Sequence, residues 1–223
     1  MRYVVLSDAH GNKPYFERCI RHIDAMNPEQ IIYLGDAYGY FDDGDYVIDE
    51  LRERGAKILK GNHEAMLLGE IFLDDEKDRL YHLKEKRNSI STDKMMFLKD
   101  LTSSYETVIS DKRCLFVHGT IDNPLLGYMY EDDCFYEELN YEYVFMGHTH
   151  RPYVKKVGAT VYVNVGSCGL PRDNGNKPSF CVFDGAFENL FILRETINLD
   201  MIEKKYYFNV DKRVIDVLRR KDK

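Results

Sequence analysis

The chain has 223 residues, and its 38 acidic and 31 basic side chains give a formal net charge of −7 at pH 7. This length favours one domain with a full hydrophobic core, and a hydrophobic share of 44% is ordinary for a globular protein. The acidic balance argues against general binding to a nucleic-acid backbone, because such binding requires a basic surface.

The sequence shows no targeting signal. Met1 leads directly into the strand-like residues 2–6, with no basic segment, apolar region or cleavage site before them. No apolar stretch approaches the length needed to cross a bilayer. The cysteines show no paired spacing: they are Cys19, Cys114, Cys134, Cys168 and Cys181. Such scatter is typical of reduced, mostly packed thiols, so we expect a cytoplasmic protein that does not associate with membranes.

The first part of the chain alternates short apolar runs with amphipathic stretches. The runs are rich in β-branched or aromatic residues, which predicts buried strands at 3–7, 30–34, 57–60, 113–117 and 143–146. Helical periodicity predicts helices at about 13–26 and 45–54. Strand–helix–strand alternation with these lengths indicates right-handed parallel crossovers.

Residues 65–101 are predicted to form helices, because they are rich in Leu, Met, Lys and Glu and lack Pro and Gly after Gly69. The segment joins two strands that both end in polar motifs, which leaves two arrangements open. It forms either a cap over the site or a helical layer packed on the sheet. In both cases we expect a single domain over residues 1–223.

The sequence changes in character after His150. Apolar or alternating runs separated by glycine-containing turns predict antiparallel hairpin strands of a second sheet, at 153–157, 160–165, 179–183 and 190–193. A last strand near 206–210 precedes a helix from about Lys212, with Asp211 as the expected N-cap. The expected fold class is α/β, with two packed mixed β-sheets flanked by helices.

Polar motifs directly follow the predicted strands of the first part. They are Asp8-Ala9-His10, Gly35-Asp36, Gly61-Asn62-His63-Glu64, His118-Gly119 and Gly147-His148-Thr149-His150. Open α/β sheets place their ligands at the carboxyl ends of strands, so we expect these motifs to meet. In an extended segment, residues two apart share a face, which would direct Asp8 and His10 to one point and His148 and His150 to another.

Mixed imidazole and carboxylate ligands suit Mn, Fe, Zn, Ni or Co, whereas an all-oxygen site for Mg or Ca would not need so many histidines. Asp36 follows a strand and a glycine, which leaves room for its carboxylate to bridge two ions. Each motif alone is weak, since a lone Asp-X-His is often a solvated turn. Together, in one order and each after a strand, they indicate two adjacent metal ions, a device for hydrolysing phosphate esters.

The ordered series from Asp8 to His150 resembles the calcineurin-like metallophosphoesterase superfamily. The later Asn164-Val165-Gly166-Ser167 and Pro171-Arg172-Asp173 are similar to small bacterial and archaeal members of that group. The resemblance implies a metallophosphatase-type α/β/β/α sandwich with two divalent transition-metal ions. It also implies hydrolysis of a phosphodiester or phosphomonoester bond in a small phosphorylated substrate, by direct attack of a metal-bridging hydroxide.

The resemblance also implies a role for each motif residue. The implied ligands are Asp8, His10 and His150 for one ion, Asn62, His118 and His148 for the other, and Asp36 as the bridge between them. His63 is adjacent to Asn62 and cannot easily point to the same ion. The resemblance makes it the catalytic group that contacts the phosphate and protonates the leaving oxygen, although its orienting partner is unassigned.

The sequence departs from some relatives after the bridging position. Protein serine/threonine phosphatases of the superfamily carry Asp and Arg shortly after this aspartate, whereas here Asp36 is followed by residues 37–41 with neither. That weakens an alternative function as a phosphoprotein phosphatase. The small prokaryotic group tends to have glycine where this chain has Phe41, whose ring would either narrow the pocket or pack beneath the loop.

Two further residues are candidate substrate contacts. Arg172 would meet a substrate phosphate, or else face solvent or pair with Asp173. Tyr40 would stack on a base or an aryl group. The remaining histidines, His22 and His82, lie in predicted helices away from the motifs. Other functions that stay open are a nucleotide pyrophosphohydrolase and a non-catalytic interaction scaffold on the same fold.

Overall fold

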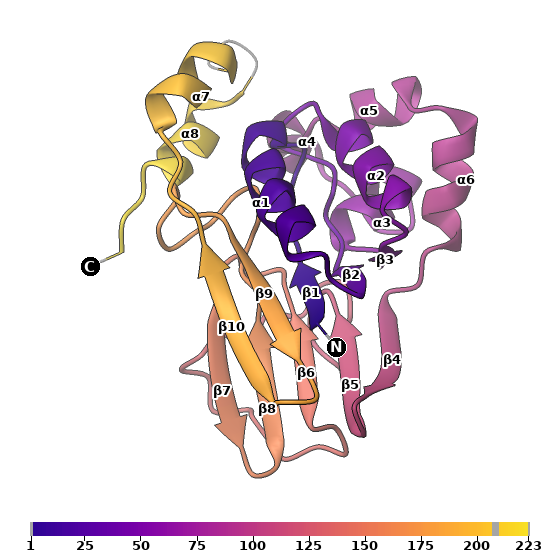
Figure 1. The fold of residues 1–223 in the computed structure, drawn as a ribbon. Coiled ribbons are helices and arrows are strands. Elements are labelled where there is room, and N and C mark those ends of the chain that lie inside the picture. The colour runs from indigo at the N-terminus through magenta and orange to yellow at the C-terminus, as the bar shows by residue number, and fades with distance from the viewer. Residues whose placement is uncertain (1, 207–209, 223) are drawn as a thin grey trace.

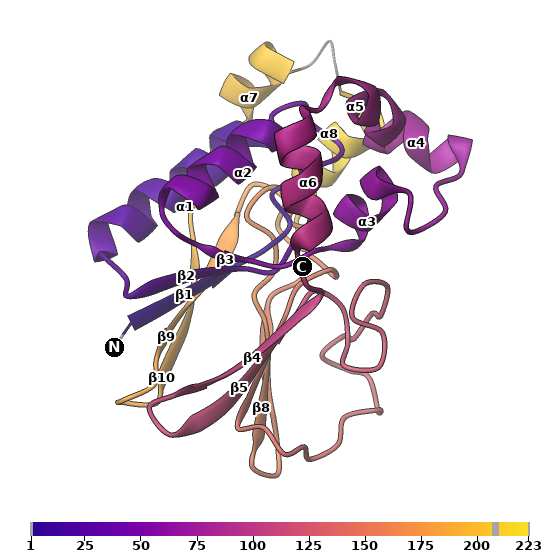
Figure 2. The ribbon, with the colours of Figure 1, turned by 90° about the vertical axis from the view of Figure 1, so that its right-hand side faces the viewer.

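The computed structural model, which describes residues 2–206 and 210–222, contains two five-stranded β-sheets that pack face to face (Figures 1 and 2). The first sheet has the order β10-β9-β1-β2-β3. Its strands are β1 (Arg2–Leu6), β2 (Gln30–Tyr33), β3 (Lys57–Ile58), β9 (Ser179–Asp184) and β10 (Asn189–Arg194). The strands β1, β2 and β3 are parallel, whereas β9 runs antiparallel to both β1 and β10.

The second sheet has the order β4-β5-β6-β8-β7. Its strands are β4 (Ser104–Ile109), β5 (Lys112–Val117), β6 (Tyr143–Met146), β7 (Tyr153–Val157) and β8 (Thr160–Asn164). The central strands β5, β6 and β8 are parallel, and each edge strand pairs antiparallel with its neighbour. Both sheets are therefore mixed, which confirms the expected α/β class with two packed sheets.

Helices lie on the outer face of the first sheet and beyond one of its ends. They are α1 (Lys13–Met26), α2 (Gly44–Glu53), α3 (Asn62–Leu68), α4 (Asp75–Tyr81), α5 (Leu83–Ser89), α6 (Thr92–Asp100), α7 (Leu199–Tyr206) and α8 (Lys212–Leu218). In Figure 2, α1 and α2 lie across the first sheet, with α3 to α6 beside them. In Figure 1, α7 and α8 lie together beyond one end of β10. The outer face of the second sheet is covered by apolar side chains of the irregular segment 119–142.

Successive side chains along a strand point to opposite faces of its sheet and so contribute to two different core layers. On β1, Val5 lies in the core between the two sheets, whereas Val4 and Leu6 face the helices. On β6, Phe145 faces the first sheet and Val144 faces segment 119–142. Because the strands bury both faces, they read as continuous apolar runs, which is why their positions were predictable.

The predicted strands after His150 do not form the second sheet by themselves, which corrects the expectation. Strands β7 and β8 join the second sheet, and β8 pairs parallel with β6. Strands β9 and β10 join the first sheet, next to β1. The physical reason is that β9 is apolar on both faces, so it is stable only as an inner strand between two others.

Two elements were not predicted. Strand β4 alternates exposed and half-buried residues at a sheet edge, so it lacks the continuous apolar run by which the inner strands were found. Helix α7 ends at Tyr206, and the strand predicted near 206–210 falls largely on residues 207–209, which lie outside the described residues. Helix α8 begins as expected, with the Asp211 side chain accepting a hydrogen bond from Arg213 N at 2.8 Å.

The cysteines are free thiols, of which Cys134 is exposed and the other four are buried, in agreement with the expectation of mostly packed thiols. Across residues 2–206 and 210–222, none of the helices combines the length and the apolar character that a bilayer span requires.

The layer between the sheets makes a prediction about stability. Phe145 is 0% exposed there, and its ring stacks on that of Phe116 with centroids 4.8 Å apart. Phe145→Ala should lower the free energy of unfolding by about 3–5 kcal/mol in urea titrations, because it leaves a cavity between the sheets. The control Phe187→Ala, at a side chain 74% exposed, should change it by less than about 0.5 kcal/mol. Equal losses would contradict this view of the core.

Candidate metal centre

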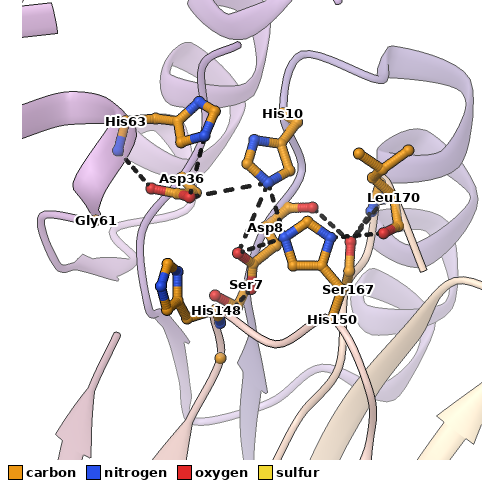
Figure 3. A network of polar contacts seen from close by, with 12 residues as sticks. Ser7, Asp8, His10, Asp36, Gly61, His63, His148, His150, Ser167 and Leu170 are labelled. Atoms are coloured by element: carbon orange, nitrogen blue, oxygen red, sulfur yellow. Dashed lines mark hydrogen bonds and ion pairs between the residues drawn. The ribbon is translucent and has the colours of Figure 1, made fainter. Parts of the chain in front are cut away.

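The five polar motifs meet at one end of the two sheets, in the loops that follow β1, β2, β3, β5 and β6. Figure 3 shows residues of each motif except that of His118. Backbone hydrogen bonds join these loops. The amide of Asp8 donates to Gly35 O at 3.0 Å and that of His10 donates to Asp36 O at 2.9 Å. The amide of His148 donates to Asp8 Oδ2 at 3.0 Å, which connects the second sheet to the first. The site is therefore shared by both sheets.

One cluster consists of Asp8, His10 and His150, all buried. The Nε2 atoms of His10 and His150 lie 3.1 Å apart, and Asp8 Oδ1 lies 3.2 Å from His150 Nε2 and 3.7 Å from His10 Nε2. Two imidazole nitrogens and one carboxylate oxygen thus point to a common position from β1 and β6, segments 140 residues apart in sequence.

A second cluster surrounds His118. Its Nε2 lies 2.9 Å from Asn62 Oδ1, 3.1 Å from His148 Nδ1 and 3.4 Å from Asp36 Oδ2. The same Asp36 Oδ2 lies 3.8 Å from His10 Nε2 in the first cluster. The structure therefore brings all seven predicted ligand residues together, with Asp36 facing both clusters.

The donor atoms fit divalent transition-metal ions. Each cluster mixes imidazole nitrogen with oxygen, the ligand combination of Mn, Fe, Zn, Ni and Co sites. Within the described part of the chain, the buried Asp8 Oδ1 has no hydrogen-bond partner, although burying an unpartnered carboxylate oxygen is costly. A cation at each cluster would satisfy this oxygen and separate the facing imidazole nitrogens.

In three of the predicted ligand histidines, the hydrogen bond of Nδ1 determines which ring nitrogen is available to bind a metal ion. Nδ1 of His10 lies 3.1 Å from Tyr38 O, that of His118 lies 3.1 Å from Leu34 O, and that of His150 lies 2.6 Å from Leu170 O. Because a carbonyl oxygen can only accept, Nδ1 carries a proton in each ring, so in the neutral form of each ring the Nε2 lone pair faces the cluster. Backbone carbonyls in this position are the usual outer partners of metal-ligating histidines.

Burial keeps most of these imidazoles neutral. It lowers the pKa of His148 to about 3 and that of His63 to about 4, and it lowers the pKa of His10 and His150 as well. For His118, burial also acts downward, but the carboxylate of Asp36 outweighs it and raises the pKa to about 9. Neutral imidazole is the form that binds a metal ion.

The ligands converge through left-handed backbone rather than through an extended segment, which corrects the geometric argument from sequence. Asp8 has φ 59° and His10 has φ 50°, and His148 and His150 have φ 63° and 59°. Asp36 has φ 62°. Such a conformation costs of order 1–3 kcal/mol at a non-glycine residue and persists only where its surroundings enforce it. Here the hydrogen bonds between the motif loops hold it.

Glu64 has a structural role that sequence reasoning did not assign. Its buried carboxylate accepts four backbone hydrogen bonds, from Asp36 N, Ala37 N, Tyr38 N and Gly61 N, at 2.7, 2.8, 3.3 and 2.9 Å. It thereby ties the loop of the bridging aspartate to the start of α3. The available signal was an acidic residue at the third position of a helix that begins after a glycine.

His63 lies beside the clusters. Its backbone N donates to Asp36 Oδ1 at 2.8 Å, and its Nε2 lies 3.8 Å from Asp36 Oδ2. Its Nδ1 has no hydrogen-bond partner among the described residues and faces Gly39, where a Cβ would lie 2.2 Å from it. Gly39 has φ +94°, so both its backbone and this close approach require glycine.

Aromatic rings hold the two outer imidazoles in place. The ring of His63 stacks on Tyr40 with centroids 5.5 Å apart and contacts Tyr81 at 4.4 Å. The ring of His148 packs against Tyr128 at 4.1 Å. The sequence contains 17 tyrosines, so Tyr81 and Tyr128 could not be singled out before the structure placed them here.

The structure also places the other candidates. Arg172 donates from NH2 to the Tyr40 hydroxyl at 3.3 Å, whereas Asp173 pairs with Arg194 instead. Phe41 packs in an apolar cluster and also lines a cavity with Tyr81, so the two alternatives for its ring do not exclude each other. His22 pairs with Glu195 on the surface, and His82 forms the C-cap of α4; neither belongs to the clusters.

Comparisons with known proteins agree with this picture. Residues 1–186 match the family model of the calcineurin-like phosphoesterase superfamily domain. The chain is 27% identical over 226 residues to an uncharacterised protein of Methanocaldococcus jannaschii, with 92% of this chain and 91% of that protein covered.

Two solved structures share the fold. One is a hypothetical protein of Pyrococcus horikoshii, with a TM-score of 0.86, 19% identity, and 100% of this chain and 99% of that chain covered. The other is a metallophosphoesterase from Sphaerobacter thermophilus, with a TM-score of 0.78, 20% identity and 98% of each chain covered. At these identities the two likenesses support the fold alone.

The position of Glu64 generates a prediction. Glu64→Gln keeps the size of the side chain but turns one acceptor oxygen into a donor that faces backbone N–H groups. The free energy of unfolding should fall by about 1–3 kcal/mol, and affinity for Mn²⁺, measured by calorimetry, should fall about 10–100-fold as Asp36 shifts. Glu53→Gln, at an exposed position of α2, is the matched control and should change neither quantity. Unchanged Mn²⁺ affinity in Glu64→Gln would rule out this positioning role.

Proposed function

Because the chain belongs to the calcineurin-like phosphoesterase superfamily, we propose that it is a dinuclear metal-dependent phosphoesterase. It hydrolyses phosphodiester or phosphomonoester bonds of a small molecule, with residues 1–223 acting as a single domain. The observation that carries this proposal is the pair of buried ligand clusters that share Asp36.

In this proposal Asp8, His10 and His150 hold one ion and Asn62, His118 and His148 hold the other, with Asp36 between them. Two divalent ions held there, whether Mn, Fe, Zn, Ni or Co, would supply Lewis acidity and a hydroxide at neutral pH, and the proposed reaction is direct attack of that hydroxide on phosphorus. No serine or cysteine nucleophile is required, and the buried thiols near the sheets stay unused.

The charges of the site favour a phosphate. Asp8 and Asp36 bring two negative charges, whereas two divalent ions bring four positive ones, so the loaded centre attracts an anion although the whole chain is acidic. Arg172 and Tyr40 are the proposed substrate contacts. The guanidinium group matches phosphate oxygens, and the Tyr40 ring lies beside His10 with centroids 4.9 Å apart.

His63 is the proposed proton donor to the leaving oxygen. It lies close enough to Asp36 for its ring to reach a phosphate held at the clusters, yet its nearest ring nitrogen is 3.8 Å from the bridging carboxylate. Its Nε2, with His10 and Asp36, also belongs to a third possible ligand group, so a metal-ligand role is the competing assignment. Metal content in a His63 variant separates the two.

We also propose that the helical segment 65–101 is both a packed layer and a partial cover of the site. Leu67, Leu83 and Leu98 are buried in the same core as the first sheet. Tyr81, at the end of α4, contacts the His63 ring. Segment 65–101 therefore contributes to the shape of the substrate pocket while being anchored in the core.

The first test of the proposal is metal-dependent hydrolysis. The metal-reconstituted protein should release nitrophenol from a nitrophenyl phosphodiester or monoester with Mn²⁺ or Ni²⁺, and a chelator should abolish this activity until metal is restored. A protein that binds metal at both clusters but hydrolyses neither ester, nor any member of a metabolite panel, would be a non-catalytic scaffold instead.

The second test concerns His63. His63→Ala should lower kcat about 10²–10⁴-fold, because the leaving oxygen loses its proton donor. Metal content, measured by elemental analysis, should stay that of the wild type. His22→Ala removes a histidine outside the clusters and should retain full activity. If His63→Ala instead loses metal, His63 is a ligand.

A further inference from the structure

A cavity lies next to the metal centre. It has a volume of about 300 Å³, and its walls come from α8, the end of α4 and the loops that carry Tyr40 and Arg172. Three arginines line it, Arg172, Arg213 and Arg220, together with apolar side chains that include Leu170 and Val214. We call this cavity the arginine pocket. Its volume is at the lower end of the range for small-molecule sites.

Direct contacts connect the arginine pocket to the metal centre. Arg172 N donates to the carbonyl oxygen of the proposed ligand His150 at 3.1 Å, and the Arg172 guanidinium donates to the Tyr40 hydroxyl at 3.3 Å. The Tyr40 ring in turn lies beside that of His10. Arg172 and Tyr40 therefore lie between the ligand clusters and the arginine pocket. They contact the ligand residues on one side and line the pocket on the other.

The cations of this pocket are incompletely neutralised. The carboxylate of Asp173, adjacent in sequence to Arg172, is taken by Arg194. Across residues 2–206 and 210–222, no carboxylate lies at ion-pair distance from Arg172 or Arg220. Arg213 alone of the three has such a partner, Asp211, at 2.9 Å.

The two arginines without a carboxylate are also held together. Arg220 NH1 donates to the carbonyl oxygen of Arg172 at 3.1 Å, which places the Arg220 guanidinium beside the backbone of Arg172. Both residues line the same cavity, and two cations on the walls of one cavity attract an anion into it. Guanidinium groups bind phosphate oxygens with two parallel hydrogen bonds, so this arrangement suits a phosphoryl group.

We propose that the arginine pocket binds a second phosphoryl group of the substrate, while the metal centre holds the one that is hydrolysed. This inference rests on the proposed function and narrows its substrate class to small molecules that carry two phosphoryl groups on one carrier. The apolar part of the pocket, with Leu170 and Val214, then contacts the carrier.

Three sugar derivatives of matched size test this inference. All carry a phosphoryl group at carbon six, and they differ at carbon one, which holds a hydroxyl in glucose phosphate, a phosphoryl group in glucose bisphosphate and a carboxylate in phosphogluconate. Phosphate release gives kcat/KM for each with the metal-reconstituted protein, and calorimetry gives the affinity independently of turnover. We expect a preference for the bisphosphate of at least about tenfold over the monophosphate.

In the variant Arg220→Gln, the ratio of kcat/KM for glucose bisphosphate to kcat/KM for glucose phosphate should fall close to one. Arg219→Gln is the matched control: Arg219 is the next residue along the chain, but its side chain pairs with Glu203 and does not line the pocket. Arg219→Gln should therefore keep the preference.

Each outcome bears on the inference. Equal affinity for glucose bisphosphate and glucose phosphate overturns it, whether or not the protein hydrolyses either sugar. A preference for phosphogluconate that equals the preference for the bisphosphate overturns it in favour of a carboxylate pocket. The inference is also overturned if Arg219→Gln and Arg220→Gln reduce the preference equally. The preference would then come from long-range attraction by positive charge and not from contact in the pocket. Tight binding of the bisphosphate by a protein that hydrolyses neither this sugar, nor the nitrophenyl esters, nor any member of the metabolite panel supports the pocket and refutes the proposed function.

Discussion

Two carboxylates buried at the point where the sheets meet dominate the structure. Asp8 is 0% exposed and Asp36 is 1% exposed, and a buried charge without partners is costly. Each carboxylate divides its oxygens in the same way. One accepts a backbone hydrogen bond, at 3.0 Å from His148 N for Asp8 and at 2.8 Å from His63 N for Asp36, and the other faces the imidazoles. The groups that join the loops are thus the groups that face the proposed metal ions.

Because the same carboxylates join the loops and face the imidazoles, they explain the backbone conformation of the ligand residues. Left-handed φ values at the ligand residues are unfavourable for residues with a Cβ, and they occur where hydrogen bonds between loops leave no alternative. Glu64 contributes most to this rigidity on the side of the first sheet, since one carboxylate binds four amides. On the side of His63, ring packing against Tyr40 and Tyr81 replaces the carboxylate partner that many catalytic histidines have.

The sequence contained enough information for much of the fold and for the composition of the centre. Strands such as β2 and β6 were visible as short apolar runs, and the motifs after them had to meet because strand ends meet. The pairing of β9 with β1 was not visible, because an apolar run does not specify its neighbour. The contacts of Tyr81, at the end of the short helix α4, and of Tyr128, in the irregular segment 119–142, depend on how the chain path brings them to the site, for which residue type gives no signal. The pairing of Asp173 with Arg194 rather than Arg172 was hidden for the same reason.

The distance along the chain between Asp8 and His148, 140 residues, has a consequence for the order of folding. Closing a loop of that size is entropically unfavourable until the intervening strands have paired. The first ligand cluster needs residues from both ends of that loop, so a nascent chain that ends before β6 lacks His150, one of the three donors. Under the proposed function, metal binding at this cluster therefore follows assembly of the sheets and does not nucleate it.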